Sequence, residues 1–213
     1  MPSRLATLAS GLAVAGCAVF GDRSGTAEPA FTVLSRQDPV EIRQYGPRIA
    51  AETVVDADEE KARNEGFRRL AAYIFGANKG AAEIAMTAPV AQSPVGEPGT
   101  RIAMTAPVAQ AQAGQGGWTV RFFMPAEWTM ASLPPPNDPA VRLVEVPGET
   151  VAVLRFTGSR APDAVARQSA ALLQALATGP WQPTGTPVAW FYDPPWTLPW
   201  LRRNEVAVTV ARR

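Results

Sequence analysis

The segment VEIRQYGPRIAAETVV, residues 40–55, decides the predicted fold because its layout occurs twice in the chain. Residues 40–45 alternate apolar and polar side chains, and Gly46-Pro47 then forms a turn before a second strand at 49–55. Residues 141–157, VRLVEVPGETVAVLRFT, repeat this layout around Pro147-Gly148. Each segment predicts a β-hairpin, and the repetition indicates a weak internal duplication.

A predicted helix follows each of these segments. Residues 59–75 come after Asp56 and Asp58, whose side chains can cap a helix, and they end at Gly76. Residues 162–178 begin at a proline and end before a Gly-Pro pair. Two such halves predict an α+β domain, a pseudo-duplicated antiparallel sheet with two long helices on one side. A cleft between helices and sheet, or across the pseudo-twofold, is the natural place for a ligand.

The nine residues IAMTAPVAQ occur at 84–92 and again, letter for letter, at 102–110. The connecting segment SPVGEPGTR is rich in glycine and proline, so the copies predict the two strands of one antiparallel pair. Pro89 and Pro107 restrict each strand to an end or an edge position. Further strands are predicted at 31–35, 118–124, 188–192 and 205–210.

Composition limits the possible functions. The chain has 213 residues, of which 46% are hydrophobic and 18% charged, so it can form a globular core. The formal charge of +1 gives no reason to expect a nucleic-acid partner. Histidine is absent, which argues against zinc hydrolase, Ser–His–Asp and Cys–His sites.

The N-terminus resembles a bacterial lipoprotein signal. Arg4 precedes an apolar run at 5–14, and the run leads to VAGC, in which Cys17 is the only cysteine of the chain. We expect a signal peptide at 1–16, a lipidated Cys17 that begins a tether at 17–29, and a single domain at 30–213. An ordinary signal peptide and a chance apolar terminus are the alternatives. The expected location is the bacterial cell envelope, facing the periplasm in a Gram-negative cell.

The segment WFYDPPWTLPWL at 190–201 is unusually aromatic, and its prolines prevent regular structure. Asp193, Arg202 and Arg203 add charged groups to this apolar surface. Such a loop can bind a flat ligand that carries carboxylates, or it can simply cover the core.

Several ordered motifs make the chain resemble the SOUL family of haem-binding proteins over residues 31–210. They are the two IAMTAPV copies, WTVRFFMP (118–125), YDPPW (192–196), RRNEV (202–206) and the helix segment GFRRLAAYIFG (66–76). The resemblance implies a twisted, pseudo-duplicated antiparallel sheet with two helices, similar to the effector-binding domains of some bacterial regulators.

The resemblance also implies a shallow hydrophobic site for haem or another tetrapyrrole, between the first helix and the loop at 192–200. The residues implied by position are Phe67, Leu70, Ala71 and Ile74 on the helix, and Phe191, Tyr192, Trp196 and Thr197 at the loop. Some members carry basic residues at the positions of Ala72 and Thr197. Here Arg63, Arg68 or Arg202 would meet the propionates instead.

Some family members use a histidine on the haem iron, and this chain has none, so an axial ligand would be methionine, tyrosine or absent. We therefore expect binding of the porphyrin face by a lipid-anchored envelope protein. One alternative is an enzyme acting in the same cleft, with Glu205 as acid or base, unless Glu205 is ion-paired with Arg202 or Arg203. The other is an envelope protein-interaction module whose aromatic loop docks on a partner.

Overall fold

The computed structural model describes residues 26–95, 117–194 and 196–213. These parts of the chain form one ten-stranded sheet, two α-helices and a short 3-10 helix. In chain order the elements are β1 (Phe31–Gln37), β2 (Val40–Tyr45), β3 (Arg48–Val55), α2 (Glu59–Ile74), β4 (Val90–Pro94), β5 (Trp118–Phe123), β6 (Val141–Val146), β7 (Glu149–Phe156), α3 (Pro162–Leu176), β8 (Trp181–Pro183), β9 (Val188–Phe191), η1 (Pro199–Leu201) and β10 (Asn204–Arg212).

Both helices begin where the sequence predicts. The Asp58 side chain caps α2 by accepting a hydrogen bond from the backbone N–H of Lys61 at 2.9 Å. Gly76, at φ 103°, then turns the chain after the helix in the left-handed region that glycine tolerates. α3 has a proline in its first turn and ends at Leu176, two residues before the predicted end.

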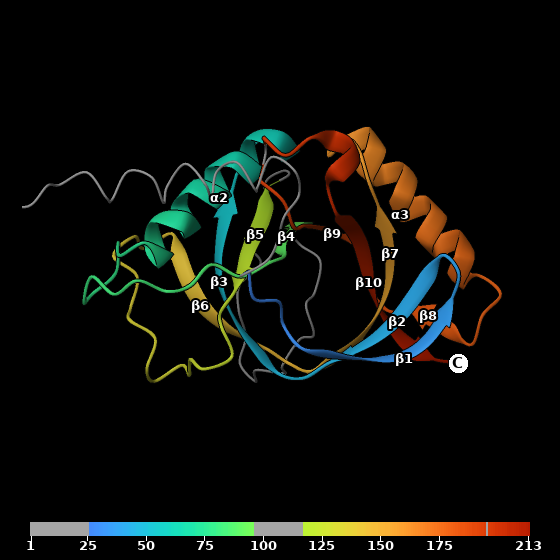
Figure 1. Ribbon diagram of the computed structural model, residues 1–213, viewed down its shortest axis with the longest axis horizontal. Coiled ribbons are helices and arrows are strands. Elements are labelled where there is room, and N and C mark those ends of the chain that lie inside the picture. Colours follow the sequence, from blue (N-terminus) through green and yellow to red (C-terminus); the bar gives the residue numbers. More distant parts are fainter. Residues whose placement is uncertain (1–25, 96–116, 195) are drawn as a thin grey trace, which may run out of the picture.

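The two predicted hairpins are wrong, because β2 does not pair with β3 and β6 does not pair with β7. The strand order is β1-β2-β7-β10-β9-β4-β5-β3-β6. Instead, β2 pairs with β7 and β3 pairs with β6, so the two repeated segments run antiparallel along each other (Figure 1). Tyr45 lies opposite Glu149 and Arg48 opposite Val146, so one register continues through both turns. The turns bend a long two-stranded ribbon and do not close hairpins.

The pairing pattern confirms the internal duplication. An exchange of the halves converts the β3·β5 pair into β7·β10, the β4·β5 pair into β9·β10, and the β3·β6 pair into β7·β2. The β4·β9 pair converts into itself, so the pseudo-twofold axis passes between these central strands. The predicted duplicated α+β fold is therefore present, with the halves interlocked through the bent ribbon.

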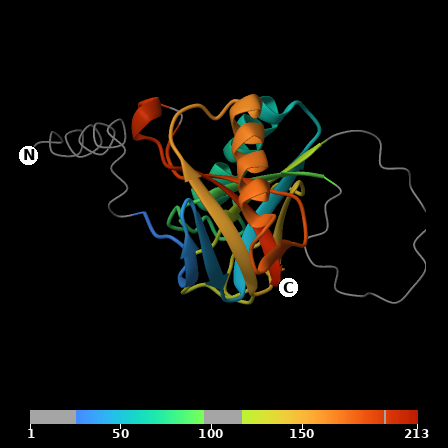
Figure 2. The same cartoon turned by 90° about the vertical axis from the view of Figure 1, so that its right-hand side faces the viewer.

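Both helices cover the same face of the curved sheet (Figures 1 and 2). Leu70 and Ile74 of α2 pack on Val120 and Phe122 of β5, while α3 packs on β7 and β10. A third cluster, which includes Tyr45, Phe123, Trp190 and Ala207, uses the alternate residues of these strands and fills the opposite face. The sheet thus separates a helix-covered face from an open, aromatic face.

The structure describes the first of the two IAMTAPVAQ copies, for which the sequence predicts pairing with the second copy. In the first copy only residues from Val90 onward are in a strand, and β4 has β5 on one side and β9 on the other. Both edges of β4 are therefore occupied. Pro89 lies directly before β4, as predicted for a residue that cannot donate to a ladder. The second copy lies outside the described residues.

Candidate functional site

A small cavity opens on the helix-covered face, above the two central strands. We call it the helix–loop cleft. Its seven lining residues are Arg63, Asn64 and Phe67 from α2, Val90 from β4, Phe191 from β9, and Arg160 and Asp193 from the adjoining loops. Its volume is about 100 Å³, well below the roughly 300–1,000 Å³ typical of small-molecule sites. The cleft can therefore hold an edge of a large ligand, and the remainder would lie across its mouth.

Two phenylalanines form the apolar wall of the cleft. Phe67 packs on Phe122 of the core, with the ring centroids 5.3 Å apart and the planes at 63°. Phe191 is buried, and its ring is covered by the guanidinium groups of Arg63 at 5.1 Å and Arg160 at 5.7 Å. The Phe191 ring thus contacts two guanidinium groups through cation–π interactions.

These two arginines form no ion pair with any carboxylate of the described residues. Arg63 Nη1 donates to the Arg160 carbonyl at 3.3 Å, and Arg160 Nη1 donates to the Asp193 carbonyl at 3.2 Å. Burial lowers the pKa of Arg63, although the charges of Glu59 and Glu60 oppose this shift. Burial and the charges of Arg202 and Arg63 lower the pKa of Arg160 to about 10, although Asp193 opposes this. An anion bound in the cleft would therefore compensate the two guanidinium charges, which are partly desolvated and repel each other.

The structure brings three of the expected residues together at the cleft: Arg63, Phe67 and Phe191. Leu70 and Ile74 are fully buried beneath α2, with Ala71 packed at the edge of the same cluster. They lie there because the apolar stripe of an amphipathic helix faces the sheet, so only its margin reaches the cleft.

The expected loop residues take different positions. Tyr192 and Thr197 are buried, whereas Trp196 is 61% exposed. Arg202 Nε donates to the Thr197 carbonyl at 2.7 Å and holds the loop closed on itself. Arg68 is exposed and ion-paired with Glu65 on the outer side of α2, away from the cleft.

Sequence reasoning missed Arg160, which contributes the second cation. It follows Gly158 and Ser159 in the turn before α3, and no motif marks it. Arg160 reaches α2 only because the two halves meet at β4 and β9. The duplication relates the segment before α3 to the segment before α2. This relation could have drawn attention to Arg160, but only after the two halves had been placed in three dimensions.

Glu205 lies on the opposite face and is fully buried in an ion-pair network. It accepts hydrogen bonds from Arg43 Nη1 at 2.8 Å, Arg203 Nη2 at 2.9 Å and the Tyr192 hydroxyl at 2.6 Å. Burial acts to raise the pKa of Glu205, but the hydrogen bonds and charges of Arg43, Tyr192 and Arg203 hold it below the ordinary value. A low pKa and complete burial suit a structural ion pair, not a general acid.

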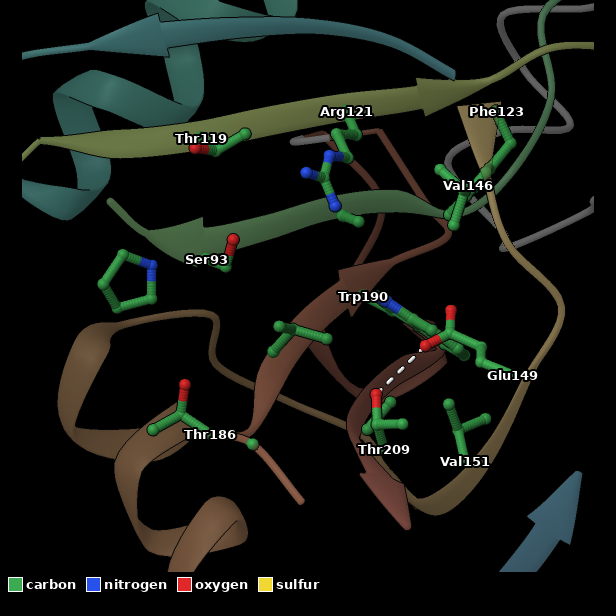
Figure 3. Close-up of a pocket in the computed structure, with 15 residues that line it drawn as sticks. Ser93, Thr119, Arg121, Phe123, Val146, Glu149, Val151, Thr186, Trp190 and Thr209 are labelled. Carbon is green, nitrogen blue, oxygen red and sulfur yellow. Dashed lines mark hydrogen bonds between the residues drawn. The ribbon is translucent and has the colours of Figure 1, made fainter. Parts of the chain in front are cut away.

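The open face carries a second cavity of about 150 Å³ (Figure 3). Figure 3 shows Trp190 beside Glu149, which accepts a hydrogen bond from the Thr209 hydroxyl at 3.0 Å. Arg121, also drawn there, is ion-paired with Glu52 at 2.6 Å. The charged groups around this cavity, Glu149 and Arg121, are already ion-paired, in contrast to Arg63 and Arg160 of the helix–loop cleft.

Neither a group of side chains able to hold a metal ion nor a helix able to span a membrane is found in the parts of the chain that the structure describes. No group of three or more acidic, cysteine or histidine side chains is placed to hold a metal ion there. None of the helices of residues 26–95, 117–194 and 196–213 is long and apolar enough to cross a bilayer.

Solved structures share this duplicated α+β fold at low sequence identity. The EcmrR C-terminal domain has a TM-score of 0.56 at 12% identity, with 82% of this chain and 98% of that domain covered. In the EcmrR–DNA complex the TM-score is 0.55 at 11% identity, and the chain spans 57% of the longer EcmrR chain. A hydrolase from Listeria innocua has a TM-score of 0.51 at 12% identity, with 84% and 94% covered. These likenesses define the class of fold alone.

The family is given by the sequence profile. The profile of the SOUL heme-binding protein family matches residues 26–209, and the chain therefore belongs to this family. The resemblance inferred from the ordered motifs is confirmed. Among curated proteins, no sequence matches the chain.

Proposed function

We propose that the helix–loop cleft binds the carboxylate-bearing edge of haem or a related tetrapyrrole. The observation that carries this proposal is the pair of half-buried guanidiniums, Arg63 and Arg160, which share the Phe191 ring and form no ion pair within the described residues. Guanidinium groups bind carboxylates in a planar fork, and the adjoining phenylalanines suit a flat apolar macrocycle. Membership of a haem-binding family supports the same ligand class.

The cleft suits the edge of the macrocycle better than its metal. The seven residues that line it include no methionine, tyrosine or cysteine, and the chain has no histidine. The chain's residues therefore supply cations and an apolar wall but offer no strong axial ligand at this place. Metal-free protoporphyrin should bind within about tenfold of haem, a difference of about 1.4 kcal/mol or less.

We also propose that the protein works as a lipid-anchored envelope protein. The support is the signal-like pattern of Arg4, the apolar run and VAGC, with Cys17 as the single cysteine of the chain. An anchor at Cys17 would hold the domain beside a membrane, from which an apolar tetrapyrrole could be received.

Titration of metal-free protoporphyrin and its dimethyl ester into the purified chain tests the binding proposal. The ester lacks the carboxylates, so it should bind about tenfold or more weakly if Arg63 and Arg160 receive them. The double variant Arg63→Gln/Arg160→Gln should weaken binding of the acid to the level of the ester and leave the ester unaffected.

Arg68→Gln is the matched control, because Arg68 lies on the same helix but is exposed and paired with Glu65. It should leave both affinities unchanged. Equal binding of the acid and the ester to the wild type would contradict the proposal, as would an unchanged affinity in a folded double variant.

A further inference from the structure

A much larger cavity lies away from the helix–loop cleft, at the bend of the two-stranded ribbon. Its volume is about 980 Å³, and its walls are residues 27–30, 46–49, 124–130 and 145–147, together with Ala85 and Thr87. No residue lines both this ribbon cavity and the helix–loop cleft. In Figure 1 the bend lies at the lower edge of the molecule, while α2 and α3 occupy the upper part.

The ribbon cavity has the size and wall of a ligand site. About 300–1,000 Å³ is typical of small-molecule pockets with mainly apolar walls. The large apolar lining residues of the ribbon cavity are Met124, Trp128 and Met130 from one loop, and Ile49 and Val146 from the ribbon. Methionine side chains adapt their shape to what they contact, so this wall suits an apolar guest.

Arg48 provides an unusual polar group in this wall. Its side chain is only 8% exposed, and its guanidinium lies between the rings of Tyr45 at 4.3 Å and Phe123 at 4.5 Å. The guanidinium is ion-paired with Glu149, but Arg48 Nε is buried and has no hydrogen-bond partner within the described residues. An unsatisfied buried donor is costly, and a ligand oxygen that displaced the groups covering Nε would satisfy it.

The charged residues that line the cavity determine whether a charged or an uncharged ligand oxygen can bind there. Glu149 already neutralises Arg48, and the remaining charged lining residues are the acidic Glu28, Glu127 and Glu145. Glu28 is ion-paired with Arg203, whereas Glu127 and Glu145 are exposed and form no ion pair in the described part of the chain. A carboxylate, sulfonate or phosphate would be repelled at this mouth, but an uncharged carbonyl oxygen would not.

We propose that the ribbon cavity is a second binding site, for an uncharged apolar molecule that carries a carbonyl acceptor, such as an amide, ester or ketone. The apolar part occupies the wall formed by Met124, Trp128 and Met130, and the carbonyl oxygen accepts a hydrogen bond from Arg48 Nε. This site is independent of the tetrapyrrole site, because the two cavities share no residue and favour different ligands, uncharged in one and carboxylate-bearing in the other.

Fluorescence titration with two naphthalene dyes tests the site in the purified, unlipidated full-length chain. Prodan is an uncharged ketone, and 1-anilinonaphthalene-8-sulfonate is an anion of similar size. Prodan should bind about tenfold or more tightly than the sulfonate. The double variant Glu127→Gln/Glu145→Gln, which changes two exposed side chains, should strengthen binding of the sulfonate several-fold and leave Prodan unchanged.

Two further variants test whether the dyes bind within the cavity. Ala126→Trp adds a large ring from an exposed position in the lining and should abolish Prodan binding, whereas Ala166→Trp on the exposed side of α3 is its matched control. Arg48→Met removes the Nε donor and should weaken Prodan by about tenfold. Circular dichroism shows whether each variant is folded.

The outcomes separate this proposal from the tetrapyrrole proposal. Ala126→Trp should leave protoporphyrin binding intact, and Arg63→Gln/Arg160→Gln should leave Prodan binding intact. Unchanged Prodan binding in a folded Ala126→Trp variant would overturn the ribbon site, whatever the porphyrin result. Stronger binding of the sulfonate than of Prodan to the wild type would overturn the assigned ligand class.

Discussion

Replacement of Glu205 by glutamine should destabilise the fold more than any surface charge change. The Glu205 side chain is completely buried, while Arg43 and Arg203, which donate to it, are 6% and 15% exposed. Glutamine keeps the shape of the side chain but removes its charge. The substitution therefore leaves two guanidiniums buried without their shared carboxylate.

The size of the effect depends on the charges that remain. Removal of one partner from a buried ion pair costs about 3–5 kcal/mol. Arg43 keeps Glu41 at 2.6 Å and Arg203 keeps Glu28 at 2.8 Å, so we expect the lower end, about 3 kcal/mol. For a domain of this size, this corresponds to a decrease in Tm of about 6–12 °C. Glu41→Gln, which affects a part-exposed pair, should cost less than about 1 kcal/mol.

The assay is urea unfolding followed by circular dichroism, at several pH values. The folded-state pKa of Glu205 is lowered from 4.5. Its stabilisation is therefore complete above the unfolded-state pKa and is lost as pH falls through the folded-state value. The difference in unfolding free energy between wild type and Glu205→Gln should thus be constant near neutral pH and decrease below about pH 4.5.

A loss of less than about 1 kcal/mol near neutral pH would refute this reasoning, because the two arginines would then not depend on Glu205 for compensation. A difference that grows as pH falls would refute the direction of the pKa shift. Either result would reopen Glu205 as a candidate acid.

Four other outcomes are expected. Gly66→Ala should cost about 1–3 kcal/mol in urea unfolding, because its Cβ would lie 2.6 Å from Val120 Cγ2; a variant as stable as the wild type would show that α2 does not approach β5 so closely. Burial raises the pKa of all three tyrosines, so stability should fall above about pH 10, with phenolate absorbance appearing only on unfolding; earlier titration would contradict their burial. Trp196→Ala should weaken protoporphyrin binding several-fold with an unchanged Tm, because the ring is exposed; unchanged affinity would place the ligand away from this loop. Cys17→Ser should move the protein from the membrane to the soluble fraction of its native host, and a wild type already soluble would refute the anchor.

Local sequence predicted most elements with accurate bounds. β2, β6 and the start of α2 follow directly from alternation, turn residues and the Asp58 cap, since these depend on neighbours in the chain. The short β8 was missed, because its three residues give no periodic pattern. The duplication was also visible, because each half repeats the order of turn and helix.

The choice of strand partners required the tertiary structure. A Gly-Pro or Pro-Gly pair predicts a reversal of the chain, yet here each turn bends a continuing two-stranded ribbon. Arg48 and Glu149 meet across the pseudo-twofold axis, and the strands on both sides of each turn pair with strands of the other half. Likewise, β4 pairs with β9, a strand of the other half of the chain. Pairing energies come from whole ladders and buried faces, which no local pattern contains.

The sequence by itself determined the helices, most strands, the duplicated plan and the family, because these are carried by residues close together or by ordered motifs. Only the tertiary structure decided that Arg160 joins Arg63 over Phe191, that Glu205 is neutralised by Arg43, and that a cavity opens at the bend beside Arg48. Each of these depends on side chains from distant segments. Their charge, burial and hydrogen bonding exist only once the two halves have interlocked.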